Sequence, residues 1–328
     1  MHPMLRLLAI GAGVGLAYTL PMRLLFAWAG EAHNGATVGV AGVMTTAFLF
    51  GVPAATGALS VGWDGQAGPV PLRRALLLPW VACATAVLVA MLTLIEGSIC
   101  LAMAAPVFLL MGSLGGWAMW WTQRRRANRG GAGVASLSIA ALLPLVWGGA
   151  EAQLTAPADT WQVTNVQVIA APVAVVWEQV ASVRKIEPSE LPPSFAHWIG
   201  LPRPIEATLS APAKGGVRMA SFERGLVFRE EVTDWQPGKT IAFGIRAEQA
   251  PAEALDEHVV VGGRYFDVLD GRYTLRAIDP QHTEVTLSST HRLSTTLNGY
   301  AGLWTRAIMW DLQRVILHVV AKRSESRS

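Results

Sequence analysis

The stretch that decides the fold is NGYAGLWTRAIMWDLQRVILHVVAKR, which covers residues 298–323. Its apolar side chains recur at the spacing of a helix that lays one broad face on a core, and they are Trp304, Ile308, Leu312, Val315, Ile316 and Val319. A separate polar stripe consists of Asp311, Arg314 and His318. Asn298 suits the helix start, and Lys322 and Arg323 suit the end where the helix dipole is negative. At about 1.5 Å per residue this helix is about 40 Å long, so it requires a large sheet to cover.

The chain before this helix has the pattern of a sheet. Residues 161–169 alternate as a strand, and Pro172 then begins a short helix at 173–183. Residues 187–204 contain five prolines, which predicts a loop or short helices. Four or five further strands are expected, at 216–224, 226–235, 240–247, 271–278 and 283–292. The sequence therefore predicts an α+β domain with an antiparallel sheet and a closing helix.

Four stretches of this half carry a family resemblance: VQVIAAPVAVVW (166–177), GVRMASF (216–222), FREEVTDW (228–235) and YAGLW (300–304). With the order of strands and helices, they resemble the START-like helix-grip fold of the SRPBCC superfamily, which includes polyketide cyclases and lipid-transport proteins. The resemblance covers about residues 160–322. It implies a curved sheet wrapped on the C-terminal helix, with an apolar cavity for a hydrophobic small molecule between them. Activity does not follow, because one fold hosts many functions.

The two-residue period of the strands predicts which side chains face the interior between sheet and helix. The candidates for a ligand cavity are Arg218, Phe222, Phe228, Glu230, Phe243, Tyr273, Leu287 and His291 on the strands, with Trp304 and Ile308 on the helix. The same residues suit a filled core of sheet on helix equally well. The sequence leaves both interpretations open.

Three of these candidates are polar in a way that matters for function. If Arg218 and Glu230 both point inward they should be paired, since a lone buried charge is very costly. Such a pair either stabilises the fold or binds a ligand head group. His291 either has a structural role, with its ring hydrogen-bonded in the core, or is a polar contact for the ligand at the cavity mouth. No catalytic set is assigned: the sequence has no G-x-S-x-G or H-E-x-x-H motif and its seven histidines are scattered, so neither a cofactor nor a metal site is predicted.

The first 150 residues differ in kind from the remainder. They contain eight arginines, no lysine and three acidic residues, a net charge of about +5, whereas the remainder carries about −2. Five apolar segments are long enough to cross a bilayer, near residues 4–29, 36–59, 75–95, 98–121 and 133–150. We therefore expect an α-helical transmembrane bundle of about five spans at 1–152, a linker at 153–160, the START-like domain at 161–323 and a tail at 324–328.

The arginines of the short loops predict the orientation, because such loops resist translocation. Arg6, Arg73, Arg74 and the cluster at 124–129 lie on one side if the N-terminus is cytoplasmic. An odd number of spans then exports the C-terminal half, which in a Gram-negative bacterium means an inner-membrane protein with a periplasmic domain. The alternative is a signal peptide at 1–29 with an Ala27-Trp28-Ala29 cleavage site. Arg23 argues against it, and the four remaining spans would leave the same loops inside.

The function expected from these features is binding of a lipid or other hydrophobic small molecule beside the membrane, for transfer or sensing. Phe195, Trp198 and Ile199 in the proline-rich segment are the predicted membrane gate, because aromatic side chains favour the interface. The expected partners are the bilayer and the apolar ligand, and the basic charge lies in the hydrophobic half, so nucleic acid is not expected. Two alternatives remain: a cyclase- or hydrolase-like enzyme acting through Arg218, Glu230 or His291, and a non-enzymatic partner-binding or sensor domain. The oligomeric state is left open.

Overall fold

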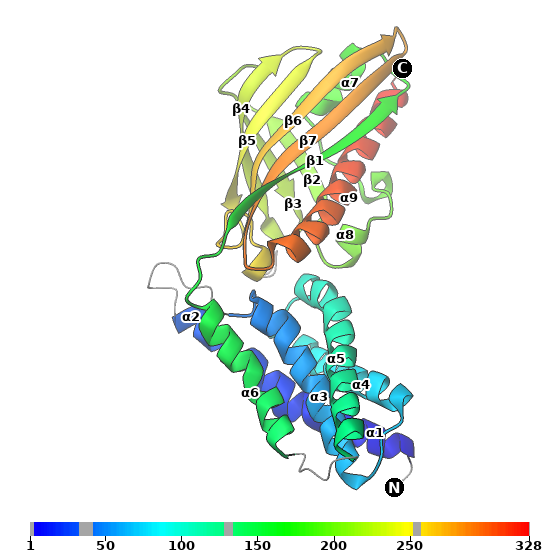
Figure 1. The fold of residues 1–328 in the computed structure, drawn as a ribbon. Coiled ribbons are helices and arrows are strands. Elements are labelled where there is room, and N and C mark those ends of the chain that lie inside the picture. The colour runs from blue at the N-terminus through cyan, green and yellow to red at the C-terminus, as the bar shows by residue number, and fades with distance from the viewer. Residues whose placement is uncertain (1–2, 33–41, 128–133, 252–256, 328) are drawn as a thin grey trace. The chain divides into compact units, whose positions relative to one another are not determined.

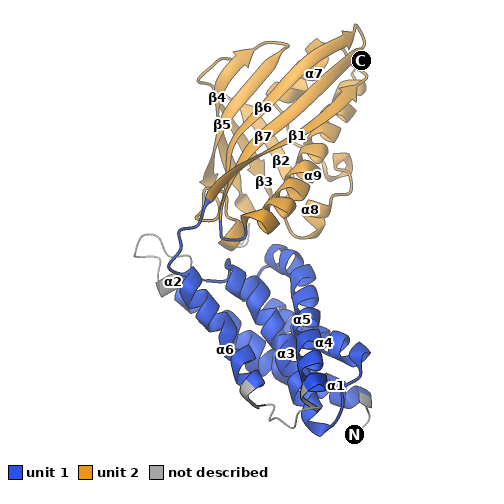
Figure 2. Cartoon of the chain, viewed as in Figure 1, with its two compact units in different colours: residues 1–157, 295–297 blue, residues 158–294, 298–328 orange. Residues whose placement is uncertain are grey.

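A computed structural model describes residues 3–32, 42–127, 134–251 and 257–327 (Figure 1). The chain divides into two compact units, which Figure 2 shows in different colours. Unit 1 consists of residues 1–157 together with 295–297, and unit 2 of residues 158–294 and 298–328. Unit 1 is helical, whereas unit 2 combines one sheet with helices.

The helices of unit 1 follow the apolar segments of the sequence. They are α1 (Pro3–Val14), the π-helical turn η1 (Gly15–Thr19), α2 (Leu20–Ala32), the π-helical turn η2 (Ala47–Gly51), α3 (Val52–Asp64), the 3-10 turn η3 (Gly65–Ala67), α4 (Leu72–Leu92), α5 (Ser98–Ala127) and α6 (Val134–Glu151). Within the described residues, three helices are long and apolar enough to cross a membrane: Met4–Gly30, Leu72–Leu92 and Ser98–Arg125. A fourth apolar helix, Ser136–Glu151, is shorter.

The predicted second span, near residues 36–59, differs most from the structure. Residues 36–41 lie outside the described residues, and the helix starts only at Ala47 and ends at Asp64. Its start is set by a distant carboxylate: Glu151 accepts hydrogen bonds from the backbone N–H groups of Thr46 (2.8 Å) and Ala47 (2.9 Å). Because this cap comes from the other end of unit 1 in sequence, no local pattern fixes the helix boundary.

Charged side chains join the helix ends of unit 1. Asp64, at the end of α3, is 4% exposed and binds both Arg6 on α1 (2.9 Å) and Arg74 on α4 (2.6 Å). Arg23 on α2 binds Glu96 between α4 and α5 at 2.6 Å. The helices between these ends approach closely: a Cβ on Gly57 of α3 would lie 1.9 Å from the carbonyl oxygen of a glycine on α5. Ion pairs and close backbone contacts thus hold unit 1 together.

Unit 2 is a seven-stranded antiparallel sheet that curls around one long helix (Figure 1). Its strands are β1 (Ala158–Ile169), β2 (Pro204–Leu209), β3 (Val217–Phe222), β4 (Val227–Gln236), β5 (Thr240–Gln249), β6 (Phe266–Asp279) and β7 (His282–Ser294), in the order β1-β7-β6-β5-β4-β3-β2. Its helices are α7 (Val173–Ala181), α8 (Phe195–Trp198) and α9 (Asn298–Glu325), with 3-10 turns η4 (Pro188–Glu190), η5 (Glu223–Gly225) and η6 (Glu257–Val259). This is a helix-grip arrangement.

Several elements of unit 2 depart from the sequence-based expectation. Strand β1 begins at Ala158, inside the expected linker, and β6 begins at Phe266, five residues before the expected start at 271. The edge strand β2 was not expected, because it is only six residues long and begins with Pro204. The helix α9 continues two residues beyond Arg323, and Ser324 in the expected tail is fully buried. The side chain of Glu325 accepts a hydrogen bond from the backbone N–H of Ala170 (3.1 Å), which holds the helix end on the sheet.

The core of unit 2 fills the space between the inner face of the sheet, α7 and the second half of α9. Its members are Ile169, Ala171, Val176, Val180, Val232, Ile241, Phe243, Tyr273, Leu275, Val285, Leu287, Leu317, Val320 and Ala321. Residues with odd numbers on β7 belong to this face from Thr283 to Leu293, as strand parity requires. Aliphatic and aromatic side chains therefore fill the interior at the α7 end of the domain.

Candidate functional site

Arg218 and Glu230 lie opposite each other on β3 and β4, 5% and 8% exposed. The Nε of Arg218 donates to Oε2 of Glu230, so the pairing expected from the sequence is present. The Nη1 atom donates to the carbonyl oxygen of Val180, at the end of α7, at 2.9 Å. Although burial disfavours its charged form, attraction to Glu230 raises the pKa of Arg218. Arg218 therefore stays positively charged inside the domain.

Aromatic rings complete the surroundings of this ion pair. The guanidinium carbon of Arg218 lies 3.9 Å from the ring centre of Phe243 and 5.6 Å from that of Tyr273. Burial raises the pKa of Tyr273, so its phenol is neutral. Leu287 packs in the same core. Since a carboxylate, a helix carbonyl and two rings already surround the guanidinium, this cluster suits a structural role better than head-group binding.

The two remaining phenylalanine candidates lie elsewhere on the sheet. Phe222 ends β3 and Phe228 is the second residue of β4, and their rings meet edge to face with centroids 5.4 Å apart. Both are half-buried and lie outside the main core. They close the hairpin end of the two strands instead of joining Arg218.

His291 is fully buried on the inner face of β7, toward the end of the domain where β1 and α9 begin. Its Nε2 atom lies 2.9 Å from Oγ of Ser289, and its ring lies parallel to that of Phe266, with centroids 6.0 Å apart. Burial lowers the pKa of His291 to about 4, although Asp270 opposes the shift. The imidazole is therefore neutral near pH 7.

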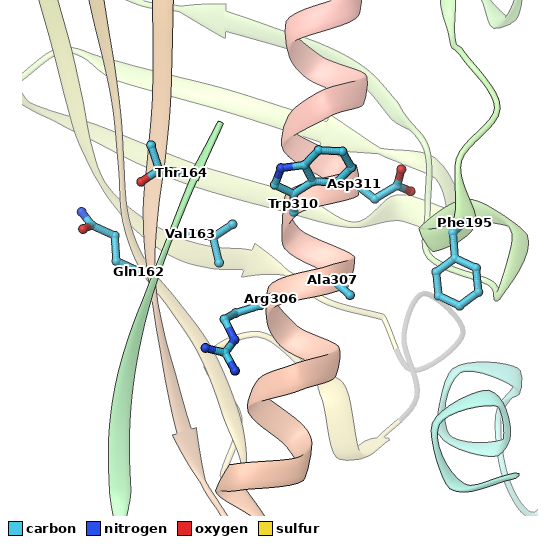
Figure 3. Close-up of a pocket in the computed structure, with 8 residues that line it drawn as sticks. All are labelled: Gln162, Val163, Thr164, Phe195, Arg306, Ala307, Trp310 and Asp311. Carbon is cyan, nitrogen blue, oxygen red and sulfur yellow. The ribbon is translucent and has the colours of Figure 1, made fainter. Parts of the chain in front are cut away.

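An open groove of about 580 Å³ lies between the edge strand β1 and the first half of α9. Its lining residues, drawn in Figure 3, are Gln162, Val163, Thr164, Phe195, Arg306, Ala307, Trp310 and Asp311. Val163 points from β1 toward α9, while Gln162 and Thr164 project from the other side of the strand. Arg306 extends from α9 toward β1 (Figure 3). The groove is thus lined by apolar residues such as Val163, Ala307 and Trp310, with Arg306 and Asp311 as its charged residues.

The two charged residues of the groove differ in their partners. Asp311 accepts hydrogen bonds from Oγ of Ser194 (2.5 Å) and the backbone N–H of Ala196 (3.0 Å), and it binds Arg314 at 2.7 Å. Burial opposes its ionisation, but these hydrogen bonds lower the pKa of Asp311. Arg306 makes no ion pair with any residue that the structure describes; its guanidinium lies over the ring of Trp161, 4.7 Å from its centre. Among the residues that the structure describes, the positive charge of Arg306 therefore has no paired counter-charge in the groove.

Exposed apolar side chains continue from the groove over α8 and the first turns of α9. We call this the aromatic surface; it consists of Phe195, Trp198, Leu303, Trp304 and Trp310. Trp198 is 82% exposed and Leu303 56%. Phe195 stacks on Trp304 with ring centroids 6.1 Å apart, and lies at the same distance from Trp198.

Two of the three predicted gate residues are exposed and one is buried. Phe195 and Trp198 belong to the aromatic surface, but Ile199 is 3% exposed. Ile199 directly follows the single turn of α8. Its side chain faces the domain, as does that of Ala196, which is fully buried. The predicted cavity residue Ile308 is likewise buried, at 7% exposed, whereas Trp304 is half-buried at the surface.

Most of the groove residues were not predicted from the sequence. Strand periodicity predicts the inward-facing residues of the strands, whereas the groove lies at the sheet edge and uses exposed residues of α9. Ala307 and Trp310 are apolar residues outside the predicted apolar face of that helix, and this is the one local signal. Their meeting with β1 depends on how the sheet curls, which no spacing along the chain reveals.

Comparison with known protein families and with curated proteins found no match. Solved structures are similar over half of the chain or somewhat more. The Zhui aromatase/cyclase from Streptomyces sp. R1128 has a TM-score of 0.34 at 14% identity, over 52% of this chain and 97% of that one. A START superfamily protein from Mycobacterium smegmatis has a TM-score of 0.35 at 12% identity, over 51% and 99%. The di-domain aromatase/cyclase BexL has a TM-score of 0.32 at 19% identity, over 65% and 62%.

Proposed function

We propose that unit 2 binds a lipid or another hydrophobic small molecule in the groove between β1 and α9, while unit 1 anchors the chain in a membrane. The observation that carries this proposal is the groove itself. Its volume of about 580 Å³ falls within the range of pockets that hold small molecules, and such pockets combine apolar walls with a few polar groups. Val163, Ala307 and Trp310 supply the walls here.

The aromatic surface supports exchange of that ligand with a bilayer. Aromatic side chains are enriched where protein meets the membrane interface, and Trp198 and Leu303 are exposed next to the groove residues Phe195 and Trp310. Only residues 152–157 separate α6 from β1. So short a tether raises the effective concentration of a membrane surface for unit 2. We propose that Phe195 and Trp198 form the gate.

The helix ends of unit 1 support five membrane crossings. Asp64, Arg6 and Arg74 join the start of α1, the end of α3 and the start of α4. Glu151, at the end of α6, binds the residues where the helix of η2 and α3 begins. These pairings fit helices that alternate in direction. With the arginine-rich loops inside, we propose an inner-membrane protein with a cytoplasmic N-terminus and unit 2 in the periplasm.

Lipid extraction of the purified full-length protein tests the binding proposal. Native mass spectrometry should detect a bound apolar molecule that is lost in Ala307→Trp, because a bulky side chain at this groove position fills the space. The matched control is His318→Trp, which adds the same side chain at another exposed position of α9. Equal ligand content in the wild type and Ala307→Trp would contradict the proposal.

Reporter fusions at the C-terminus test the orientation. An alkaline phosphatase fused after residue 328 should be active, because that enzyme matures only outside the cytoplasm, whereas a phosphatase fused in the 124–129 arginine cluster should be inactive. The reverse pattern would place unit 2 in the cytoplasm and contradict the proposed topology.

A further inference from the structure

Trp161 of β1 and His291 of β7 are direct partners in the antiparallel register. Their Cβ atoms therefore lie about 5 Å apart, on the inner face of the sheet. Each side chain has one buried nitrogen with no hydrogen-bond partner among the described residues: Nε1 of Trp161 and Nδ1 of His291. Buried polar groups in folded proteins nearly always have a partner. Two adjacent exceptions on neighbouring strands require a physical reason.

A chain of hydrogen bonds fixes the proton on His291, and it begins at a backbone carbonyl. Because the carbonyl oxygen of Val163 can only accept, the group 3.1 Å from it must be the amide nitrogen of Gln313. The same nitrogen donates to Oγ of Ser289 at 2.8 Å. Asn165 donates to the other atom of that amide, Oε1 of Gln313, at 3.2 Å, which is consistent with this orientation.

The hydroxyl of Ser289 then determines the tautomer. It accepts from Gln313, and the acceptor that remains for its own hydrogen among the described residues is Nε2 of His291, 2.9 Å away. A neutral imidazole carries one proton, and an Nε2 that accepts leaves that proton on Nδ1. The unpartnered nitrogen of His291 is therefore an N–H donor, like the indole N–H of Trp161.

Arg306 adds a charged donor group beside Trp161. Its guanidinium lies over the ring of Trp161, 4.7 Å from the ring centre, and it makes neither a hydrogen bond nor an ion pair with any residue in the described part of the chain. It also lines the groove. The acid of the groove, Asp311, already binds Arg314. The charge of Arg306 is thus free to attract a ligand.

We propose that Trp161, His291 and Arg306 form an anion-binding site for the head group of the apolar ligand, a carboxylate or phosphate on an apolar chain that occupies the groove. This rests on the proposed function and names the polar end of its ligand. Three donor groups without an acceptor suit an oxygen that only accepts, and the positive charge suits an anion. An alcohol fits less well, because its own O–H would find no acceptor there and its charge is zero.

The test uses the full-length protein in detergent micelles with 15N-labelled tryptophan side chains, observed by NMR. Three water-soluble probes are titrated: octanoate, octyl phosphate and octanol. The indole N–H of Trp161 reports on the head-group site, that of Trp310 on the groove, and that of Trp198, 82% exposed, on the outside. A Trp→Phe variant assigns each signal. We expect saturable downfield shifts of Trp161 with an anion, at a concentration at least about tenfold below that needed with octanol.

The two anions distinguish the source of the ligand: tighter octanoate binding indicates a free acid, and tighter octyl phosphate binding a phospholipid. Arg306→Gln should weaken anion binding by about tenfold or more. Its matched control, Arg246→Gln, removes the same charge from an exposed position of β5 and should bind like the wild type.

Several results would overturn the inference. The first is a response of Trp161 to octanol that equals its response to the anions. The second is an unchanged anion affinity in Arg306→Gln. The third is a shift of the Trp198 signal as large as that of Trp161, which marks partition of the probe into the micelle. If Trp310 responds in the first two cases, the apolar groove of the proposed function stands without its anion site. If Trp310 responds to no probe, both proposals fail.

Discussion

At the scale of single residues, Arg218 and Glu230 are two charges inside an apolar core, and each depends on the other. Arg218 forms an ion pair with Glu230 and also donates a hydrogen bond to the carbonyl oxygen of Val180. Removing one partner of a buried pair leaves an uncompensated charge, whereas replacing both by apolar residues is often neutral. If the pair is structural, single replacements should therefore destabilise unit 2 and the double apolar replacement should not.

Arg218→Met should lower the free energy of opening of β3 and β4 by about 3–5 kcal/mol, because Glu230 stays buried without its partner. The double variant with Glu230→Leu should recover most of this loss. Hydrogen exchange of the β3 and β4 amides in the full-length protein, measured by mass spectrometry, gives these free energies. A double variant as unstable as the single one would show that the pair contributes more than charge compensation.

His291 gives unit 2 a stability that depends on pH. Burial lowers its pKa from 6.5 to about 4, so below pH 6.5 the unfolded chain binds a proton that the folded domain does not. The free energy of unfolding of unit 2 therefore keeps its full His291 contribution above pH 6.5. It decreases by roughly 3 kcal/mol as the pH falls to 4. Thermal unfolding of the full-length protein by near-UV circular dichroism should show this slope. His291→Gln should flatten it, and the control His318→Gln, at an exposed position, should not.

At the scale of elements, α8 is a single turn held by α9. Ser194 is the N-cap of α8, and its Oγ accepts from the N–H of His197. Asp311 of α9 accepts hydrogen bonds from that Oγ and from the N–H of Ala196 in the first turn. Arg314 also donates to the carbonyl oxygen of Pro193 at 2.6 Å. The polar stripe that the sequence places on the C-terminal helix thus fixes the segment that carries Phe195 and Trp198.

Asp311→Ala should loosen α8 without unfolding the sheet. We expect the amides of residues 195–200 to exchange about tenfold faster, since the loss of a cap costs about 1 kcal/mol or more. Asp311→Asn should have a smaller effect, because its amide oxygen still accepts one hydrogen bond. Unchanged exchange in Asp311→Ala, measured at the same pH, would mean that packing alone holds this turn.

At the scale of the whole molecule, the function proposed for the chain requires that unit 2 exchange its ligand with a bilayer. Trp198→Ser and Leu303→Ser should each slow the transfer of a fluorescent lipid from vesicles to the full-length protein by about threefold to tenfold, because less apolar area enters the interface. The control is Ile278→Ser, which removes an apolar side chain that is 49% exposed near the end of β6. An equal effect of all three variants would contradict a specific gate.

The sequence by itself determined the kinds of elements. Alternation along 283–292 predicted β7, and the three- and four-residue spacing after Asn298 predicted α9, because side-chain burial on one face imposes these periods locally. The opposite charges of Arg218 and Glu230, on neighbouring predicted strands, predicted their pairing for the same reason: a buried charge requires a partner.

Only the tertiary structure decided where the candidate site lies. The groove joins residues 162–164 to residues 306–311, and their meeting depends on the curl of seven strands around α9, which is not encoded in any short segment. The unpartnered nitrogens of Trp161 and His291 likewise follow from the register of β1 on β7. Ile199 is buried for the same kind of reason, since the hydrogen bonds of Asp311 hold α8 on α9. Local patterns specify which faces are buried, whereas contacts distant in sequence decide which buried groups remain available to a ligand.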